Sequence, residues 1–260
     1  MRPYVVVNVA MSADGKISTR ERRQVKISGA QDFSRVDQLK AESDAVMVGI
    51  GTVLADDPSL TVKSEERRTG RLNRGVDEHP VRIVVDSTAR IPPEAALLHK
   101  GAGKRIVAVS RQADPKKIAA LQKYATVIIV GENEVDLAIL MDKLGEMGIR
   151  RVMVEGGGTL IAGLITAGLV NEIYTFIGNM IIGGKDSPSF VDGVPGTLTN
   201  PKGIGNNQCF NYSHSAISKS KVQPPFSTSA LHGIVRRKSS ISANSLTNAM
   251  RKNQKGCFQM

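Results

Sequence analysis

Residues 1–193 alternate between short apolar runs and longer stretches whose apolar residues recur every three or four positions. Short runs rich in Val and Ile predict β-strands, and the longer spacing predicts amphipathic helices, as at Phe33, Val36 and Leu39. Strands are therefore expected at residues 4–10, 45–49, 81–86, 105–110, 126–130, 151–155 and 172–177. Helices are expected at residues 30–42, 115–124, 135–148 and 159–167.

The order of these elements repeats a strand–helix–strand unit. Such a repeat is typical of an α/β protein with three layers, in which helices flank a mainly parallel central sheet. Ligands in these sheets bind beyond the carboxyl ends of the strands. The residues that follow each strand are therefore the first candidates for chemistry.

Two segments depart from this pattern. Residues 64–79 are charged and lack an apolar period, which predicts a mobile surface loop with solvated arginines. Residues 194–260 contain nine Lys or Arg, no Asp or Glu, and ten serines after position 212. This composition predicts a disordered or poorly packed tail, with a domain boundary near Gly193.

The net charge of +11 belongs to that tail, because residues 1–193 hold 26 basic and 24 acidic residues. The charge therefore does not indicate specific nucleic-acid binding by the body of the chain. No apolar run approaches the roughly 20 residues of a membrane span, and the N-terminal run is too short for a signal peptide. A cytoplasmic protein without membrane contact is expected.

Side chains that could act alone are scarce in the body. Cys209 and Cys257 both lie in the tail, so no disulfide, zinc site or cysteine nucleophile is expected before it. The four histidines lie outside every motif, and neither a Ser-His-Asp set nor a metal site can be recognised. This scarcity favours a reaction in which a cofactor carries the chemistry.

The sequence EGGGTL at residues 155–160 follows a predicted strand and opens a predicted helix. Glycines let backbone amides approach a ligand, and the positive end of a helix suits a phosphate. A plain strand–helix turn is the alternative. Glu155 favours a binding site, because a carboxylate at the end of a buried strand needs a partner.

Three other strand ends carry unusual residues. Gly49 and Gly51 permit close approach to a ligand, and Asp56 and Asp57 follow; we expect one of these carboxylates to accept hydrogen bonds from a ligand and the other to be structural. Asn8 interrupts an apolar strand, shares a face with Val6 and Ala10, and needs buried hydrogen-bond partners. The third end is Asp86–Ser87, where a hydroxyl could meet a cofactor phosphate.

Four stretches together closely resemble the riboflavin-biosynthesis reductase family. They are VNVAMSADGKI at 7–17, MVGIGTVLADDPSLTV at 47–62, VRIVVDS at 81–87 and VEGGGTL at 154–160. The resemblance covers about residues 3–193 and is strongest to the archaeal stand-alone form. It implies a dihydrofolate-reductase-like fold and a homodimer. It also implies reduction of the ribosylamino side chain of a phosphorylated pyrimidine to ribitylamino, with NADPH preferred and NADH possible.

The resemblance also implies roles for individual residues. The candidate catalytic residues are Asn8, Asp14 and Glu155, and a proton could come from water or from substrate held by Asp14 or Glu155. The substrate-binding residues would be Lys40, Leu60, Lys63 and Glu155. The cofactor-binding residues would be Ala10, Thr52, Asp56, Val85, Ser87, Gly156, Gly157, Gly158, Thr159 and Leu160.

Two departures from the family leave alternatives open. Deaminase zinc signatures are missing, so reduction without deamination is expected. In place of the amphipathic strands of relatives, residues 194–260 suggest out-of-frame translation or an unrelated extension. The alternatives are therefore an impaired NADPH-binding homologue with a defective C-terminus, a reductase of another pteridine-like substrate, or salt-sensitive nucleic-acid binding by the tail.

Overall fold

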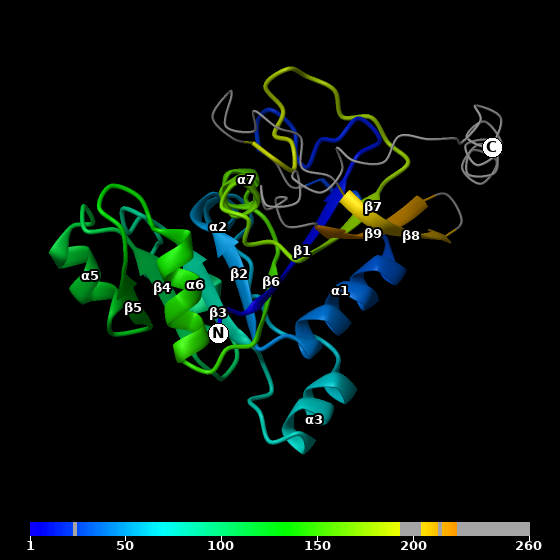
Figure 1. Cartoon of the computed structure of the whole chain (residues 1–260). Helices are drawn as coiled ribbons and strands as arrows, with labels where there is room; N and C mark the ends of the chain where they lie inside the picture. The colour runs from blue at the N-terminus through cyan, green and yellow to red at the C-terminus, as the bar shows by residue number, and fades with distance from the viewer. Residues whose placement is uncertain (23–24, 193–203, 213–214, 223–260) are drawn as a thin grey trace, which may run out of the picture. The chain divides into compact units, whose positions relative to one another are not determined.

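The computed structural model describes residues 1–22, 25–192, 204–212 and 215–222. Within these residues a nine-stranded sheet has the order β5-β4-β3-β2-β6-β1-β7-β9-β8 (Figure 1). The strands from β5 to β7 pair in parallel, whereas β9 pairs antiparallel with both β7 and β8. The carboxyl ends of seven strands therefore point to one edge of the sheet.

The bounds of the elements are as follows. The strands are β1 Tyr4–Met11, β2 Ala45–Gly49, β3 Val81–Val85, β4 Arg105–Val109, β5 Thr126–Ile129, β6 Arg151–Val154, β7 Glu172–Ile177, β8 Ile204–Tyr212 and β9 Ser215–Val222. The helices are α1 Ala30–Glu42, α2 Ile50–Asp56, α3 Glu65–Asn73, α4 Ala96–His99, α5 Pro115–Leu121, α6 Leu137–Glu146 and α7 Gly158–Thr166.

Apolar side chains from alternate strand positions build a separate core on each face of the sheet. One core packs α6 and α7 against residues such as Val7, Met47 and Val154. The other packs residues of α1, α2, α4 and α5 against the intervening positions, such as Val48 and Met153. This division follows from the period of two along a strand, and it produces the predicted three-layer α/β arrangement.

The predicted elements of the body are confirmed, and most differ from the structure only at their ends. The predicted bounds of α1, β2 and β7 agree with the structure, whereas α6 is four residues shorter than predicted. The short helices α2 and α4 were not predicted, because seven and four residues are too few to display a helical period. Among the described residues the longest helix is α1 with 13 residues, and none of the described helices could cross a bilayer.

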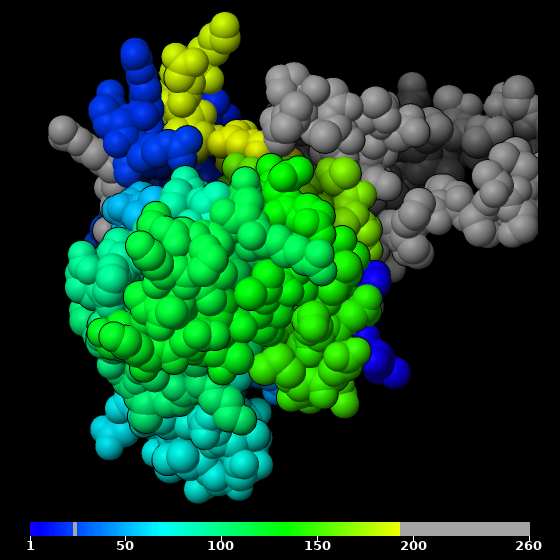
Figure 2. Space-filling model, turned by 90° about the vertical axis from the view of Figure 1, so that its left-hand side faces the viewer, coloured from blue at the N-terminus to red at the C-terminus, as the bar shows by residue number. Residues whose placement is uncertain are grey.

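The prediction of a mobile loop at residues 64–79 is wrong. Ser64 caps α3 by accepting a hydrogen bond from the amide of Arg67, and Arg71 is buried. The Arg71 guanidinium donates to the carbonyls of Ala41, Ser43 and Asp77. The sequence analysis did not predict α3 because its inward face carries a buried arginine in place of apolar side chains. This arginine binds backbone oxygens, so the segment lacks the apolar spacing of a helix. Figure 2 shows the cyan α3 segment at the lower end of the view.

Two stretches of the segment predicted as a disordered or poorly packed tail, residues 204–212 and 215–222, form strands in the structure. These residues form β8 and β9, and β9 extends the sheet from β7 through the pairing of Phe176 with Ile217. A compact unit accordingly runs from Met1 to Pro224, beyond the predicted boundary at Gly193. The other residues of 194–260 lie outside the described residues, where the prediction stays untested.

Replacement of Arg71 by Met should lower the free energy of unfolding by about 2–4 kcal/mol, because the carbonyls of Ser43 and Asp77 lose this donor and that of Ala41 keeps only Arg74. Urea denaturation measures this change, and Lys117→Met on the exposed face of α5 serves as the control. Equal midpoints for the two variants would show that Arg71 is not a structural link.

Candidate functional site

Glycines at the carboxyl edge bring two strand–helix turns into contact. Gly156 and Gly157 have φ angles of 128° and 91°, which side chains with a Cβ rarely adopt. A Cβ on Gly157 would lie 3.4 Å from the Cα of Gly49, and the Gly49 amide donates to the Gly156 carbonyl. The turn directs the N-terminus of α7 toward this edge, which suits a phosphate.

The predicted cofactor residues of the second turn surround these glycines. The Thr52 hydroxyl lies 3.6 Å from where a Cβ on Gly156 would stand. Asp57 has the structural role, because its carboxylate accepts from the Ala96 amide at 2.7 Å. Asp56 is exposed at the end of α2 and is therefore the carboxylate that a ligand could reach.

Three further members of the predicted cofactor set lie in the first turn of α7. Thr159 is exposed in the first turn of α7, whereas the side chain of Leu160 is buried in the core. The Leu160 Cβ lies 3.5 Å from where a Cβ on Gly49 would stand. A ligand could therefore meet Leu160 only through its backbone. Gly158 is buried, and a Cβ there would lie 2.6 Å from the Ser189 carbonyl.

The end of β3 lies beside this turn. Val85 pairs with Gly49 in the sheet, so its backbone borders the glycines. The Ser87 hydroxyl accepts from the Val135 amide at 3.1 Å, which fixes its position while leaving its own proton available. Burial raises the pKa of the Asp86 carboxyl, which accepts from the Ile91 amide and is directed inward. Ala10 lies half-buried near the end of β1.

A polar layer separates α1 from the sheet on the opposite side of β1 from α6 and α7. The buried Asn8 carbonyl accepts from the Arg35 guanidinium at 2.8 Å. Arg35 also pairs with Asp32 at 2.6 Å and lies 5.4 Å from the ring centroid of Tyr174. Asn8 thus obtains the partner that its burial requires, and Arg35 is a site residue that the sequence analysis did not identify.

Lys40 of α1 reaches Glu155 at the end of β6, with 3.0 Å between the Lys40 nitrogen and the Glu155 oxygen. Their side chains are only 15% and 13% exposed. Val7 pairs with Val154, so the next residues, Asn8 and Glu155, face α1 together. The structure therefore brings the catalytic candidates Asn8 and Glu155 and the substrate-binding candidate Lys40 into one layer.

Asp14 anchors a loop. Its carboxylate accepts from the Ser12 hydroxyl at 2.6 Å and from the amides of Ile182 and Gly183 at 3.1 and 2.8 Å. These hydrogen bonds, the Ser12 hydroxyl first, lower the pKa of the Asp14 carboxyl to about 2. An acid of this strength is ionised at neutral pH, so a role as proton donor is disfavoured.

Lys63 lies in the segment that joins α2 to α3, and a helix residue fixes its backbone. The Asp37 carboxylate accepts from the amides of Lys63 and Ser64 and from the Arg67 guanidinium. Burial alone would raise the pKa of Asp37, but these donors outweigh it and lower the pKa. Asp37 and Lys40 both belong to α1, so one helix positions Lys40 and the Lys63 segment.

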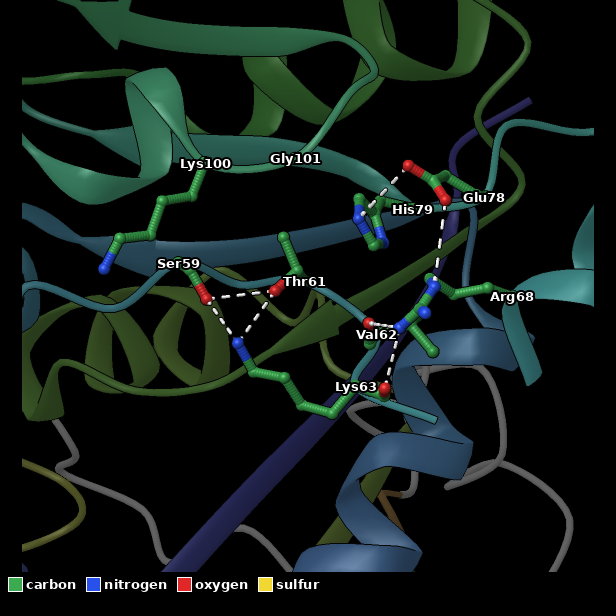
Figure 3. Close-up of a pocket in the computed structure, with 9 residues that line it drawn as sticks. All are labelled: Ser59, Thr61, Val62, Lys63, Arg68, Glu78, His79, Lys100 and Gly101. Atoms are coloured by element: carbon green, nitrogen blue, oxygen red, sulfur yellow. Dashed lines mark hydrogen bonds and ion pairs between the residues drawn. The ribbon is translucent and has the colours of Figure 1, made fainter. Parts of the chain in front are cut away.

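Lys63 borders a pocket of about 410 Å³ (Figure 3). The ammonium group of Lys63 donates to the hydroxyls of Ser59 and Thr61 at 2.8 and 2.9 Å. Partial burial, followed by the charges of Lys40 and Lys100, lowers the pKa of Lys63. The remaining walls are Val62, Arg68, Glu78, His79, Lys100 and Gly101. This pocket is polar and carries more positive than negative groups.

Leu60 is a predicted substrate-binding residue whose side chain is enclosed in the structure. Its side chain is 2% exposed and belongs to the core beneath α1 and α2. Its φ of 54° is unusual for a branched residue and turns the chain between Ser59 and Thr61. Any ligand contact of Leu60 would have to use its backbone, because the side chain is enclosed.

The structure thus divides the candidate residues into three groups. The glycine turn lies beside Thr52 and the end of β3, α1 covers Asn8 and Glu155, and Lys63 lies in the pocket beyond α1. A signal for Arg35 exists in the sequence, since Asp32, Arg35 and Leu39 share one helix face at spacings of three and four. No group of three His, Cys, Asp or Glu side chains among the described residues could hold a metal ion.

Comparison with known proteins identifies a family that matches most of the chain. The family model described as "RibD C-terminal domain" matches residues 3–204. The 2,5-diamino-6-ribosylamino-4(3H)-pyrimidinone 5′-phosphate reductase of Archaeoglobus fulgidus is 53% identical over 193 residues, which are 74% of this chain and 88% of that protein. The protein of the same name from Methanothermobacter thermautotrophicus is 47% identical over 193 residues, covering 74% and 85%.

Solved structures share the fold. A pyrimidine reductase-like protein from Corynebacterium diphtheriae has a TM-score of 0.71 at 17% identity, covering 86% of this chain and 93% of that one. The riboflavin biosynthesis reductase Rib7 of Saccharomyces cerevisiae has a TM-score of 0.65 at 21% identity, covering 85% and 90%. At these identities the likeness concerns the fold alone.

Replacement of Asp14 by Ala should release the loop at Ile182 and Gly183, and these amides should exchange with solvent at least about tenfold faster at pH 6. In the wild type the protection should persist as the pH falls to about 4. It should then weaken as the pH approaches about 2, because the carboxylate accepts these bonds only while ionised. Amide hydrogen exchange measures both effects.

The exposed Asp186 provides the control, since Asp186→Ala removes a nearby charge without removing an acceptor of these amides. Unchanged exchange at Ile182 and Gly183 in Asp14→Ala would contradict the anchoring role.

Proposed function

Because the chain belongs to the RibD C-terminal domain family, we propose that it reduces the ribosylamino side chain of 2,5-diamino-6-ribosylamino-4(3H)-pyrimidinone 5′-phosphate to ribitylamino, with NADPH as the reductant. The observation that carries the proposal is the adjacency of two surfaces at one sheet edge. The glycine turn at Gly156–Gly157 fits a phosphate, and the polar layer around Glu155 begins at the residue before it.

The residues of the turn fit a dinucleotide cofactor. Gly156 and Gly157 keep side chains away from the N-terminus of α7, and Thr52 adds a hydroxyl beside them. Val85, Ser87 and Asp56 extend this surface along the ends of β3 and α2. When bound there, NADPH would supply the hydride that reduces C1′ of the open imine form of the substrate. NADPH rather than NADH is the cofactor that the family resemblance favours.

The polar layer would bind the pyrimidine. The Glu155 carboxylate can accept hydrogen bonds from the amino groups of the ring, and its ion pair with Lys40 orients it. Asn8, held by Arg35, presents an amide beside this carboxylate. A proton must also reach the imine nitrogen. Since Asp14 is engaged with its loop, water or substrate held by Glu155 is the better source.

The pocket beside Lys63 would take the phosphate. Lys63 is charged, partly exposed and surrounded by hydroxyls, and Lys40 lies near enough to influence its pKa. A phosphorylated substrate therefore suits this surface better than an uncharged pteridine, which would leave its lysines without a counter-charge. Assembly as a homodimer accompanies the proposal as an expectation from the family resemblance, and location in the cytoplasm as an expectation from the sequence. Size-exclusion chromatography with light scattering tests the homodimer.

The purified full chain, mixed with NADPH and the ribosylaminopyrimidine 5′-phosphate, should lose absorbance near 340 nm only when both compounds are present. Substrate-dependent oxidation supports the reductase. Binding of NADPH without oxidation would instead support the alternative of an impaired homologue with a defective C-terminus. Oxidation with a pteridine but not with the pyrimidine would redirect the proposal to another substrate. Replacement of NADPH by NADH in the same assay tests the cofactor preference.

Replacement of Glu155 by Gln keeps the size of the side chain but removes the charge that pairs with Lys40. We expect kcat/KM for the pyrimidine to fall by about ten- to a hundredfold, because a partly buried ammonium loses its partner and the ring loses a charged acceptor. The exposed Glu146→Gln at the end of α6 is the control. Wild-type kinetics in Glu155→Gln would remove this residue from the site.

The double variant Lys40→Met/Glu155→Gln tests whether the pair acts as a unit. If it does, the double variant should lose little more than the more damaging single variant. Independent, additive losses would show that Lys40 and Glu155 serve separate groups of the substrate.

A further inference from the structure

Lys100 has no role in the reaction described above, yet an unusual support holds its loop. Arg82 lies near the amino end of β3, is 0% exposed, and donates to the carbonyls of Lys100, Ala102 and Gly103. Arg105 donates to the carbonyl of Gly101 at 2.6 Å and also to that of Gly103. Two guanidinium groups therefore hold four consecutive carbonyls of this loop.

This support keeps the backbone of Lys100 in place. The Lys100 amide donates to the Ala96 carbonyl at 2.8 Å, and its carbonyl accepts from Arg82. Burial, then the neighbouring Arg105, lowers the pKa of Arg82 to about 10, so the guanidinium remains charged at neutral pH. The side chain of Lys100, in contrast, is exposed and forms no ion pair or hydrogen bond with the described residues. A rigid backbone thus presents a free ammonium group.

The ammonium group of Lys100 lies close to a second lysine of the pocket, Lys63. Figure 3 shows Lys100 and Lys63 on the same side of the pocket, together with the hydroxyls of Ser59 and Thr61. The charge of Lys100 is close enough to contribute to the lowered pKa of Lys63. Like charges repel, so placing two lysines together costs free energy unless an anion binds between them. The one carboxylate of the pocket, Glu78, lies 3.8 Å from Arg68 and 3.6 Å from His79.

The wall of the pocket formed by His79 and Gly101 is closely packed. His79 is 6% exposed, and its Nδ1 is buried without a hydrogen-bond partner in the described structure. A Cβ on Gly101 would lie 2.7 Å from the His79 ring and 3.0 Å from a Thr61 methyl. Gly101 is therefore the residue that lets the Lys100 loop close against this wall.

We propose that Lys100, together with Lys63 and the hydroxyls of Ser59 and Thr61, forms a subsite for a phosphomonoester and makes Lys100 a specificity-determining residue for phosphorylated substrates. This inference rests on the proposed function, because the phosphate of the pyrimidine substrate is the intended occupant. Two ammonium groups match the double negative charge of a phosphomonoester, and hydroxyls can donate to its oxygens. A carboxylate ligand would carry half that charge.

The test compares Lys100→Ala with Lys104→Ala, an exposed lysine of the same loop that does not line the pocket. Lys100→Ala should raise KM for the phosphorylated pyrimidine by about tenfold and change kcat less than about twofold, since a ground-state contact is lost. KM for NADPH should not change. Lys100→Arg should restore most of the affinity, and Lys104→Ala should behave as wild type.

Direct binding separates this subsite from the reaction itself. Calorimetry with ribose 5-phosphate and with ribose uses no turnover, and Lys100→Ala should weaken binding of the phosphate ester alone, again by about tenfold. If the wild type binds ribose 5-phosphate through Lys100 but does not oxidise NADPH, the subsite stands and the proposed reaction fails. Unchanged KM and unchanged binding of ribose 5-phosphate in Lys100→Ala would overturn the inference. So would an equal loss of binding for ribose.

Discussion

The ion pair between Lys40 and Glu155 is the interaction on which the site is built. Glu155 directly follows the central strand β6, where its side chain is only 13% exposed, and a charge so far removed from water is stable only with a close partner. Lys40 supplies that partner from α1. The pair therefore ties the outer helix to the middle of the sheet at the point where the glycine turn begins. Binding of the pyrimidine and of the cofactor would then share one rigid boundary.

Helix α1 carries more of the site than its position on the surface suggests. Its inward face presents Arg35 to Asn8, Asp37 to the amides of Lys63 and Ser64, and Lys40 to Glu155. Apolar contacts of Leu39 keep the helix on the sheet. A helix packed only by apolar residues would be more stable, but it could not present these polar groups in fixed positions. The polar layer therefore exchanges some hydrophobic burial for a preorganised surface.

Arginines near the amino ends of the strands bind backbone carbonyls that lie outside the sheet. Arg71 binds carbonyls near the end of α1, and Arg82 and Arg105 bind the loop that carries Lys100. These carbonyls belong to the end of a helix and to a loop, and arginines with several N–H groups satisfy them together. The chain thus stabilises irregular backbone near the pocket without adding secondary structure.

Much of the fold and of the candidate site could be predicted from the sequence. Strands and helices of ordinary length show a characteristic spacing of apolar residues, and the glycines of EGGG indicate a backbone conformation that other residues rarely adopt. The α/β order, the strand ends and most cofactor candidates followed from these local signals. The sequence did not predict α3, because Arg71 replaces an apolar anchor, or β8 and β9, because pairing with β7 overrides a weak local pattern. The partners of Asn8 and Glu155, the inward turn of Leu60 and the support of Lys100 depend on residues distant along the chain. Only the tertiary structure decides which of these groups meet, since hydrogen bonds and ion pairs act over a few ångströms in space and not along the sequence.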